Sequence, residues 1–284
     1  MEPLNKKIHM SVRKKLQLYT HYFSSPWRAY PNFLIIGAQK AGTTTLFHYL
    51  TQHPQVVAPM KREIHYFDWK YHYGSLWYRA HYPLKSKLGH SKVTGEKSPS
   101  YVFHPLGAER IKETAGDSKL ILLLRDPVRR AISHYYHQVR RGRDTRDPEQ
   151  AFQEEDRIIE EAYPGLFKNP IFNKQKVRDF LRYSYKHKGL YLEQIKRYHE
   201  YFPSGQMYVE AAENLFHHPM EILPEVYRFL GIDENYVPPN LSSQNVGGYK
   251  PDESIAKVAE QLREYFRPYN EQLFEYLGKR FPWE

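Results

Sequence analysis

The stretch GAQKAGTTT, residues 37–45, constrains the fold more than any other segment of this chain. It follows an apolar run at residues 33–36 and precedes a helical pattern that starts near Thr43. A strand, a glycine-containing turn and a helix in this order place backbone N–H groups and the positive helix end around an anion. The P-loop of nucleotide triphosphatases has its lysine directly after the second glycine, whereas Lys40 here precedes Gly42. The stretch therefore predicts a phosphate-binding loop of another kind, with a tight turn before a capped helix as the alternative.

Strands alternate with helices along the chain, which is typical of an open parallel α/β sheet. The most apolar run, residues 119–125, suits a strand buried on both faces. The other expected strands cover residues 33–37, 56–58, 93–97 and 206–210. The expected helices cover residues 43–52, 105–114, 127–139, 189–201, 219–230 and 255–277, the last interrupted at Pro268. Residues 141–175 and 240–251 are expected to be loops. The pattern predicts a single α/β domain, residues 31–284, with a central parallel sheet flanked by helices.

The first 30 residues form a basic leader, in which we expect one short helix over residues 13–22. The whole chain of 284 residues has a formal net charge of +10, which favours anionic partners. Its basic residues are dispersed, and the sequence has neither a zinc-ligand spacing nor a leucine heptad. We therefore do not expect nucleic acid as a partner. No window approaches the length of a membrane span. The sequence contains no cysteine, which excludes disulfides and a cysteine nucleophile and favours a reducing, cytoplasmic location.

A second anion site is predicted at the end of the strand at residues 119–125. Arg125 lies at its C-terminal end, where open α/β sheets bind ligands, and Ser133 follows in the next helix. An arginine fork and a hydroxyl there suit one anion, although a structural ion pair with Asp126 is the alternative for Arg125. Two anion sites at two strand ends imply a ligand with phosphate groups at both ends.

The motifs K-x-G-T-T-x-L, from Lys40, and R-D-P-x-x-R-x-x-S-x-Y, from Arg125, resemble those of the PAPS-dependent sulfotransferases. PAPS is 3′-phosphoadenosine 5′-phosphosulfate, a sulfate donor with phosphate at both ends. The resemblance implies that Lys40, Ala41, Gly42, Thr43, Thr44 and Thr45 hold the 5′-phosphosulfate. It implies that Arg125 and Ser133 hold the 3′-phosphate. A late loop with Gly247, Gly248, Tyr249 and Lys250 occupies the place of a family loop that closes over the cofactor, without the family's usual cysteine pair.

Three further segments narrow the resemblance to heparan sulfate glucosaminyl sulfotransferases. They are most similar to the 3-O type and nearly as similar to N-sulfotransferase domains. They are EIHYFDWKYHYGSLWYRAHYP, GEKSPSYVFHP and LREYFRPYNEQLFEYLGKRFPWE. Glu63 matches the family's catalytic base. His65 is the rival base, or else it orients Glu63, because a histidine titrates near neutral pH. Lys97 matches a lysine that reaches across the reacting groups, and Lys40 would stabilise the departing phosphate.

The expected acceptor contacts are weaker predictions. Asp68 matches a family acid beside the acceptor, and Lys97 is also expected to contact the acceptor. Arg79, Tyr101 and Gln194 are further candidates, as are the arginines at 140, 141 and 143, for which a solvated helix end is the alternative. Sulfuryl transfer from PAPS needs no metal, and the histidines have no metal-ligand spacing, so we expect no metal.

Several functions stay open at this point. The resemblance favours transfer to a hydroxyl or amine of an anionic polysaccharide, whereas a small alcohol, phenol, lipid or protein tyrosine is the alternative acceptor. A kinase-like P-loop protein is disfavoured because position 43 is threonine and no clear Walker-B acid follows residues 122–124. A basic glycan-binding module that retains the fold without activity is the non-enzyme alternative. Animal glycan members are held in the Golgi, so the Golgi lumen is the alternative location if the chain is a trimmed luminal domain. The sequence predicts no oligomeric state.

Overall fold

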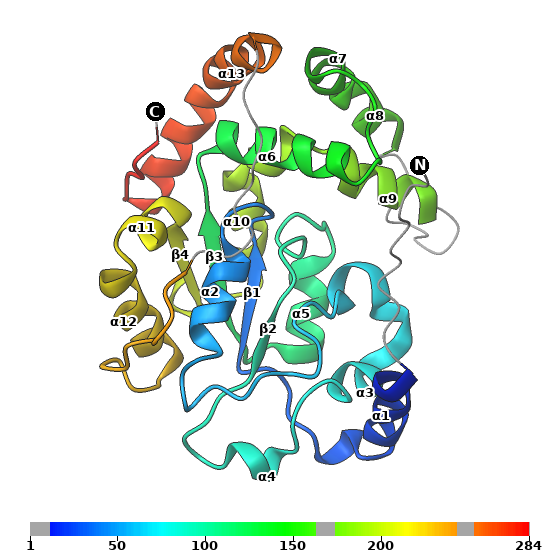
Figure 1. Cartoon of the computed structure of the whole chain (residues 1–284), viewed down its shortest axis with the longest axis vertical. Helices are drawn as coiled ribbons and strands as arrows, with labels where there is room; N and C mark the ends of the chain where they lie inside the picture. Colours follow the sequence, from blue (N-terminus) through cyan, green and yellow to red (C-terminus); the bar gives the residue numbers. More distant parts are fainter. Residues whose placement is uncertain (1–11, 163–173, 243–252, 284) are drawn as a thin grey trace.

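Four parallel strands form the central sheet of the computed structural model, which describes residues 12–162, 174–242 and 253–283. Their order across the sheet is β2-β1-β3-β4. The bounds are Phe33–Gly37 for β1, Gly95–Lys97 for β2, Lys119–Leu124 for β3 and Met207–Ala211 for β4. Helices cover both faces of this sheet (Figure 1). The predicted α/β class is confirmed.

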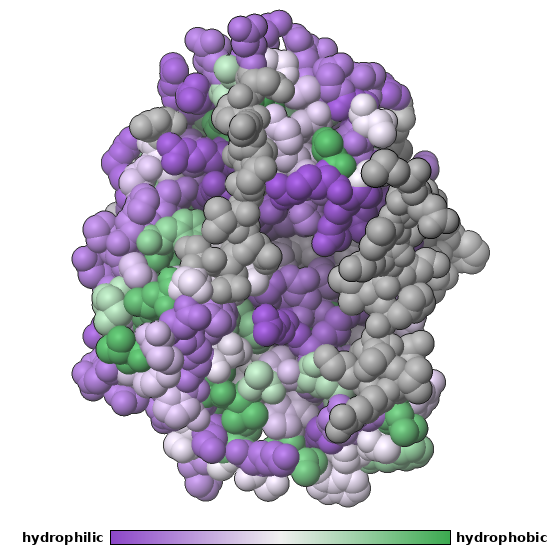
Figure 2. All heavy atoms as spheres, in the orientation of Figure 1, coloured by the Kyte–Doolittle hydropathy of each residue, from purple (hydrophilic) through white to green (hydrophobic). Residues whose placement is uncertain are grey.

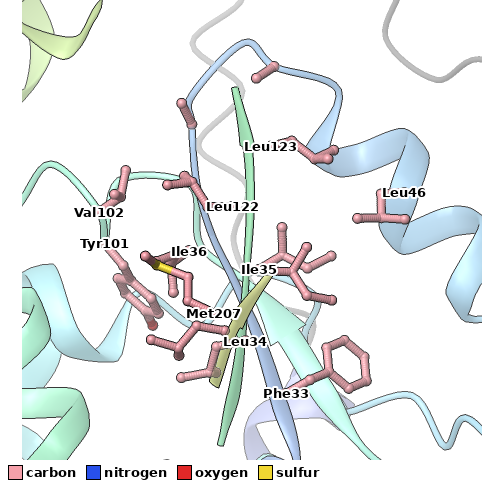
Figure 3. Packing of buried hydrophobic residues seen from close by; sticks show 14 of the residues in the cluster. Phe33, Leu34, Ile35, Ile36, Leu46, Tyr101, Val102, Leu122, Leu123 and Met207 are labelled. Carbon is pink, nitrogen blue, oxygen red and sulfur yellow. The ribbon is translucent and has the colours of Figure 1, made fainter. Parts of the chain in front are cut away.

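The two middle strands are apolar along their length because both of their faces are covered. Every residue of β1 is buried, and in β3 only Lys119 is partly exposed. Phe33 pairs with Gly95 on one side and with Lys119 on the other, which aligns the C-terminal ends of these strands. Figure 3 shows side chains of β1 and β3 packed with Leu46, Tyr101 and Met207 in the core. The sheet is therefore a rigid base for the loops that follow its strands.

Helices connect the strands in the way that a parallel sheet requires. In the first half of the chain they are α1 Val12–Phe23, α2 Thr43–Leu50, α3 Gly74–Arg79, α4 Lys85–Leu88, α5 Gly107–Ala115 and α6 Pro127–Arg140. In the second half they are α7 Pro148–Gln153, α8 Glu155–Ala162, α9 Lys174–Tyr183, α10 Tyr191–His199, α11 Ala212–His217, α12 Pro219–Leu230 and α13 Glu253–Leu277. A short π-helix lies at Tyr66–Lys70. Short 3-10 helices lie at Ser25–Trp27, Tyr71–Tyr73, His187–Gly189 and Ser204–Gln206.

Two of the expected elements are wrong. The predicted strand at residues 56–58 is only an isolated bridge, in which Val56 pairs with Val93. The predicted loop over residues 141–175 instead contains α7 and α8. The side chain of Asp147 accepts a hydrogen bond from Gln150 N at 2.9 Å, which caps α7, and Phe152 is buried against α6 and α13. Capping and burial of one face stabilise these helices despite their polar composition.

The closing helix α13 runs through Pro268, where the sequence predicted an interruption. Proline removes one backbone hydrogen bond and clashes with the preceding turn. Pro268 lies on the exposed side of the helix, however, where water can satisfy the freed carbonyl group. Leu262, Phe266 and Phe274 on the opposite side are buried. Their burial outweighs the local cost of the proline.

The leader contains the expected short helix, α1, which lies against α3. His21 Nδ1 donates a hydrogen bond to the carbonyl oxygen of Ala80 at 3.0 Å. Figure 1 shows α1, α3 and α4 gathered at one end of the molecule, away from α13. Within the described part of the chain, no helix combines the length and the apolar character that crossing a membrane requires.

Candidate active site

The glycine loop after β1 has the geometry of an anion cradle. Gly42 precedes α2 with φ of 73°, and Lys40 also has a positive φ of 75°. A Cβ atom on Gly42 would lie 2.6 Å from the ring of Phe216, so only glycine fits there. The first N–H groups of α2 have no partner within the helix and lie at its positive end. The loop can therefore bind a phosphate or phosphosulfate group.

The second predicted anion site lies beside the first. Arg125 follows β3 and donates from Nη1 to the carbonyl oxygen of Lys40 at 3.0 Å, which ties the two strand ends together. Asp126 caps α6 by accepting from Arg129 N at 2.6 Å, so it is occupied by the helix end. Ser133 lies in α6 and is buried, with its surface on the same cleft as Lys40 and Arg125. The predicted ion pair of Arg125 with Asp126 is not among the ion pairs of the described residues.

One cleft of about 1250 Å³ joins these residues to the proposed catalytic groups. Figure 2 shows hydrophilic residues gathered around the hollow in the middle of the molecule. Among its described lining residues eleven are basic and one, Glu63, is acidic. The basic residues are Lys40, Lys61, Arg62, Lys97, Arg125, Arg140, Arg141, Arg143, Arg178, Arg182 and Lys188. Such an excess of positive charge fits an anionic ligand, and PAPS has phosphate at both ends.

The electrostatics at Lys40 fit a bound anion. Burial, together with the charges of the nearby Arg140 and Arg125, lowers the pKa of Lys40 to about 8. A phosphate group in the loop would reverse this effect, because a negative charge stabilises the ammonium form. The site therefore gains favourable charge interactions when an anion enters it.

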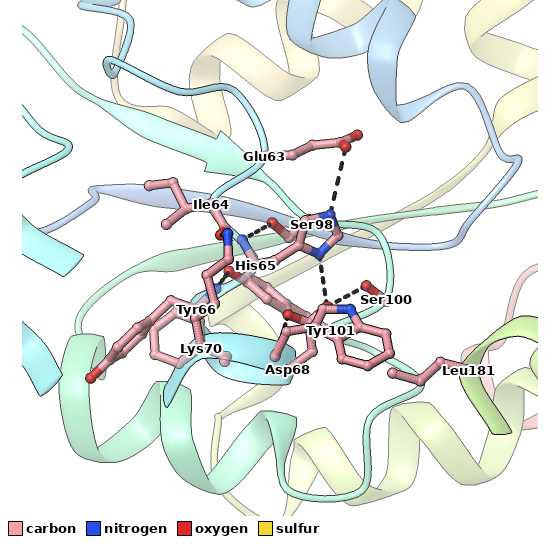
Figure 4. A network of polar contacts seen from close by, with 12 residues as sticks. Glu63, Ile64, His65, Tyr66, Asp68, Lys70, Ser98, Ser100, Tyr101 and Leu181 are labelled. Atoms are coloured by element: carbon pink, nitrogen blue, oxygen red, sulfur yellow. Dashed lines mark hydrogen bonds and ion pairs between the residues drawn. The ribbon is translucent and has the colours of Figure 1, made fainter. Parts of the chain in front are cut away.

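Glu63, His65 and Lys97 lie together at the edge of the same cleft. Lys97, the last residue of β2, donates from Nζ to Glu63 Oε1. His65 Nε2 lies 3.6 Å from Glu63 Oε2, and His65 Nδ1 lies 2.9 Å from Asp68 Oδ2. Figure 4 shows this chain of contacts continuing to Ser100, whose hydroxyl donates to Asp68 at 2.5 Å. The arrangement places a carboxylate in the cleft with a histidine and a buried carboxylate behind it.

The pKa values of this group distinguish its two candidate bases. Burial would raise the pKa of Glu63, but hydrogen bonding from His65 and the charge of Lys97 lower it to about 2. Burial would lower the pKa of His65, but the charge and hydrogen bond of Asp68, with those of Glu63, raise it to about 10. At neutral pH, Glu63 is an ionised proton acceptor and His65 already holds its proton. This arrangement favours Glu63 as the base and His65 as a positioning residue.

A buried network holds the backbone beside Glu63 in place. Glu96 in β2 is fully buried, and its carboxylate accepts from Ile64 N at 2.8 Å and from the Tyr101 hydroxyl at 2.9 Å. The Tyr101 oxygen in turn accepts from Tyr66 N at 2.8 Å. His65 N donates to the Ser98 hydroxyl at 3.1 Å. The segment that carries Glu63 and His65 is therefore fixed against β2 through three successive N–H groups.

Raising the pH is expected to remove stability that depends on His65. Because its pKa is raised in the folded protein, from 6.5 to about 10, the folded state holds this proton more tightly than the unfolded chain. The stabilisation is fully present below pH 6.5 and is lost as the pH rises toward about 10. Measured by urea unfolding, the gap in unfolding free energy between wild type and His65→Gln should shrink across this window. The exposed His90→Gln is the matched control, and a gap that stays constant with pH would contradict the assignment.

Several predicted residues do not face the cleft. Arg79 donates to the carbonyl oxygens of Pro26 and Arg28, at 2.8 and 2.6 Å. Tyr101 is fully buried, and buried Gln194 donates from Nε2 to backbone carbonyls, at 2.9 Å to Leu190. In this structure their polar groups support the fold rather than the acceptor contacts that the sequence suggested. Ala41, Thr45 and Asp68 are likewise buried behind the cleft lining. Gly247, Gly248, Tyr249 and Lys250 lie outside the described residues.

The structure adds basic lining residues that the sequence analysis missed. Arg178 and Arg182 lie one helical turn apart on α9, so both face the cleft. Lys61 and Arg62 precede Glu63 directly, and Lys188 reaches the loop through a 2.9 Å bond to Gln39. The spacing of the arginines on α9 was a usable signal, but it went unused because no helix was predicted there.

Comparisons with known proteins were made for the sequence and for the fold. Residues 30–262 match the sulfotransferase domain family. The chain is 28% identical to the membrane-associated sulfotransferase kil1 of Dictyostelium discoideum, over 89% of this chain and 66% of that protein. It is 30% identical to heparan sulfate glucosamine 3-O-sulfotransferase 3B1 of Mus musculus, over 89% of this chain and 65% of that protein. The chain thus spans slightly less than two thirds of the length of these relatives. The crystal structure of a sulfotransferase from Alicyclobacillus acidocaldarius superimposes with a TM-score of 0.69 and 27% identity, over 89% of this chain and 98% of that one.

Proposed function

Because the chain belongs to the sulfotransferase domain family, we propose that it transfers the sulfuryl group of PAPS to a hydroxyl or amine of a glycan. The proposed acceptor is an anionic, heparan-sulfate-like glucosaminyl polysaccharide, and the second product is adenosine 3′,5′-bisphosphate. The observation that carries this proposal is the single cleft that joins the loop of Lys40, the Arg125–Ser133 pair and Glu63. A donor site and a proton acceptor within one cleft are what direct transfer between two bound substrates needs.

The donor end of the cleft is assigned to the two anion sites. The N–H groups at the start of α2 and the ammonium of Lys40 would bind the 5′-phosphosulfate. Arg125 and Ser133 would bind the 3′-phosphate, with the arginine fork supplying paired donors. PAPS supplies a sulfuryl group that is activated by its bond to phosphate. Lys40 then offers positive charge where negative charge grows on the departing phosphate oxygen.

At the acceptor end, Glu63 would take the proton of the attacking hydroxyl. A bond forms between that oxygen and sulfur, and the bond from sulfur to the phosphate oxygen breaks with its electron pair on the phosphate. Lys97 and His65 keep Glu63 ionised, as its lowered pKa of about 2 indicates. Asp68 holds His65 in place through their 2.9 Å contact. The role of these side chains is positioning and proton transfer, which general-base catalysis requires.

An anionic acceptor is favoured by the arginines of the cleft. Arg140, Arg141 and Arg143 at the end of α6 join Arg178 and Arg182 of α9 along the lining. These five charges come in addition to Lys40 and Arg125, which already serve the donor. Arginine binds carboxylate and sulfate groups through paired hydrogen bonds. A polysaccharide with such groups along its length would engage several of these side chains at once.

A transfer assay with sulfur-labelled PAPS tests this proposal. The acceptor panel holds heparosan, N-sulfated heparosan, chondroitin, simple phenols and a tyrosine peptide. We expect label in a glucosaminyl polysaccharide, and we expect the double variant Arg178→Gln/Arg182→Gln to raise the KM for that acceptor by about tenfold or more. Label in phenol or peptide alone would refute the glycan acceptor and leave the donor site standing.

A further inference from the structure

The amphipathic helix α1 presents its apolar stripe to solvent. Leu16, Tyr19 and Phe23 follow one another at helical spacing and are 66%, 71% and 80% exposed. Trp27, in the turn that follows, is 66% exposed and continues the stripe. The side of α1 that faces the protein carries the half-buried Leu18 and His21, which bonds to the backbone of Ala80. Most apolar side chains of the described part of α1 are thus exposed, whereas a surface helix usually buries its apolar side.

Apolar and basic groups lie side by side at this end of the molecule. Trp27 and Pro26 share a shallow pocket of about 410 Å³ with Leu84, Lys85 and Ser86 at the start of α4. Lys87 and Lys92 are exposed in α4 and the segment after it. Figure 1 places α1 and α4 at the same end of the molecule. We call Leu16, Tyr19, Phe23, Trp27, Lys85 and Lys87 the docking face.

Positive charge predominates in the sequence segment that contains the docking face, although Lys40, Lys61 and Arg62 of that segment lie in the cleft. Residues 3–92 hold 14 lysines and arginines but only two carboxylates, Glu63 and Asp68. That region therefore carries +12, while the rest of the chain carries −2. Both carboxylates belong to the cleft and its support, so neither neutralises the docking face. The partner of this face must tolerate apolar contact and supply negative charge.

We propose that the docking face binds the surface of an anionic lipid bilayer. Leu16 and Phe23 would enter the boundary between headgroups and acyl chains, and Tyr19 and Trp27 would lie at headgroup level. Lys85 and Lys87 would contact anionic headgroups. The contact is peripheral. It would bring the catalytic domain to a membrane surface, and no helix of the described chain would need to cross the bilayer.

The other occupants fit less well. A second copy of this chain would bring the exposed Lys85 and Lys87 of both copies into one interface, and such like-charge contact is unfavourable. A polyanionic glycan would satisfy the lysines, but its hydroxyl groups gain little from Leu16 and Phe23. An anionic bilayer offers both an apolar interior and a charged surface, so it matches all six residues of the face.

Vesicle sedimentation tests the proposal with the full chain. The protein is mixed with phosphatidylcholine vesicles that contain or lack phosphatidylserine, at low and at high salt. We expect binding only with phosphatidylserine, weakened by salt. The variant Leu16→Ser/Phe23→Ser should bind at least about tenfold more weakly. Val237→Ser/Met220→Ser, which also removes two exposed apolar side chains, should bind like wild type.

A second pair of variants tests the charges. Lys85→Glu/Lys87→Glu should abolish the preference for phosphatidylserine, whereas Lys112→Glu/Lys196→Glu, with the same change in net charge, should keep most of it. All four variants alter exposed positions, so unchanged thermal unfolding checks that each is folded. No binding to phosphatidylserine vesicles, or equal losses in docking-face and control variants, would overturn the proposal. The proposal would also be overturned if wild type did not bind vesicles but formed a dimer that Leu16→Ser/Phe23→Ser dissociates.

Discussion

Replacing Glu63 by glutamine is expected to lower kcat by about 10²–10⁴-fold, the range that loss of a general base produces. Glutamine keeps the size of the side chain but cannot take the proton of the acceptor. The carboxylate is the only acidic group among the described lining residues of the cleft, and its pKa of about 2 keeps it ionised. Affinity for adenosine 3′,5′-bisphosphate should change by less than about threefold, because Glu63 lies at the acceptor end.

The matched control is Glu200→Gln, which removes an exposed carboxylate at the end of α10 and should leave kcat unchanged. His65→Gln separates the two candidate bases. We expect it to have a smaller effect on kcat than Glu63→Gln, because His65 already holds a proton at neutral pH. A larger loss in His65→Gln than in Glu63→Gln would instead identify His65 as the base.

Replacing Lys40 by methionine is expected to lower kcat by about 10²–10³-fold, comparable to the loss of one group that stabilises charge in a transition state. Lys40 lies within the anion loop, and its ammonium is held near several arginines that the donor would neutralise. Methionine retains most of the apolar length of the side chain, so the change isolates the charge. The measurement is steady-state sulfuryl transfer with the acceptor at saturation.

Binding and catalysis should both respond at this position. Affinity for adenosine 3′,5′-bisphosphate should also fall, because this product keeps the 5′-phosphate that Lys40 contacts in the proposal. The exposed Lys112 on α5 provides the control, and Lys112→Met should match wild type in both measurements. Unaltered turnover in Lys40→Met would remove this lysine from the mechanism.

The anion loop could be predicted from the sequence because its signals are local. A buried strand, Gly42 and the start of α2 follow one another within a few residues. The ends of β1 and β3 meet because parallel strands align their C-terminal ends, and Arg125 after β3 therefore lies beside Lys40. The orientation of single side chains depends on packing at long range. Tyr101 and Gln194 were therefore assigned to the acceptor, although both turn into the protein.

The helices after α6 show a different limit. Asp147 and Pro148 form an ordinary helix start, but the polar residues around them masked it. Those helices are stabilised by the burial of a few side chains such as Phe152, which only the packed structure reveals. The arginines of α9 were missed for the same reason. The acceptor end of the cleft, assembled from distant segments, is thus the part that sequence patterns predict least.

Calorimetric titration with adenosine 3′,5′-bisphosphate tests the central claim most directly, because it needs no knowledge of the acceptor. The claim is that the Lys40 loop and Arg125 form one donor site. We predict that wild type binds one molecule per chain, and that Lys40→Met and Arg125→Met each weaken binding by about tenfold or more. Absence of binding to wild type would contradict the account. So would an affinity equal to that of wild type in both variants.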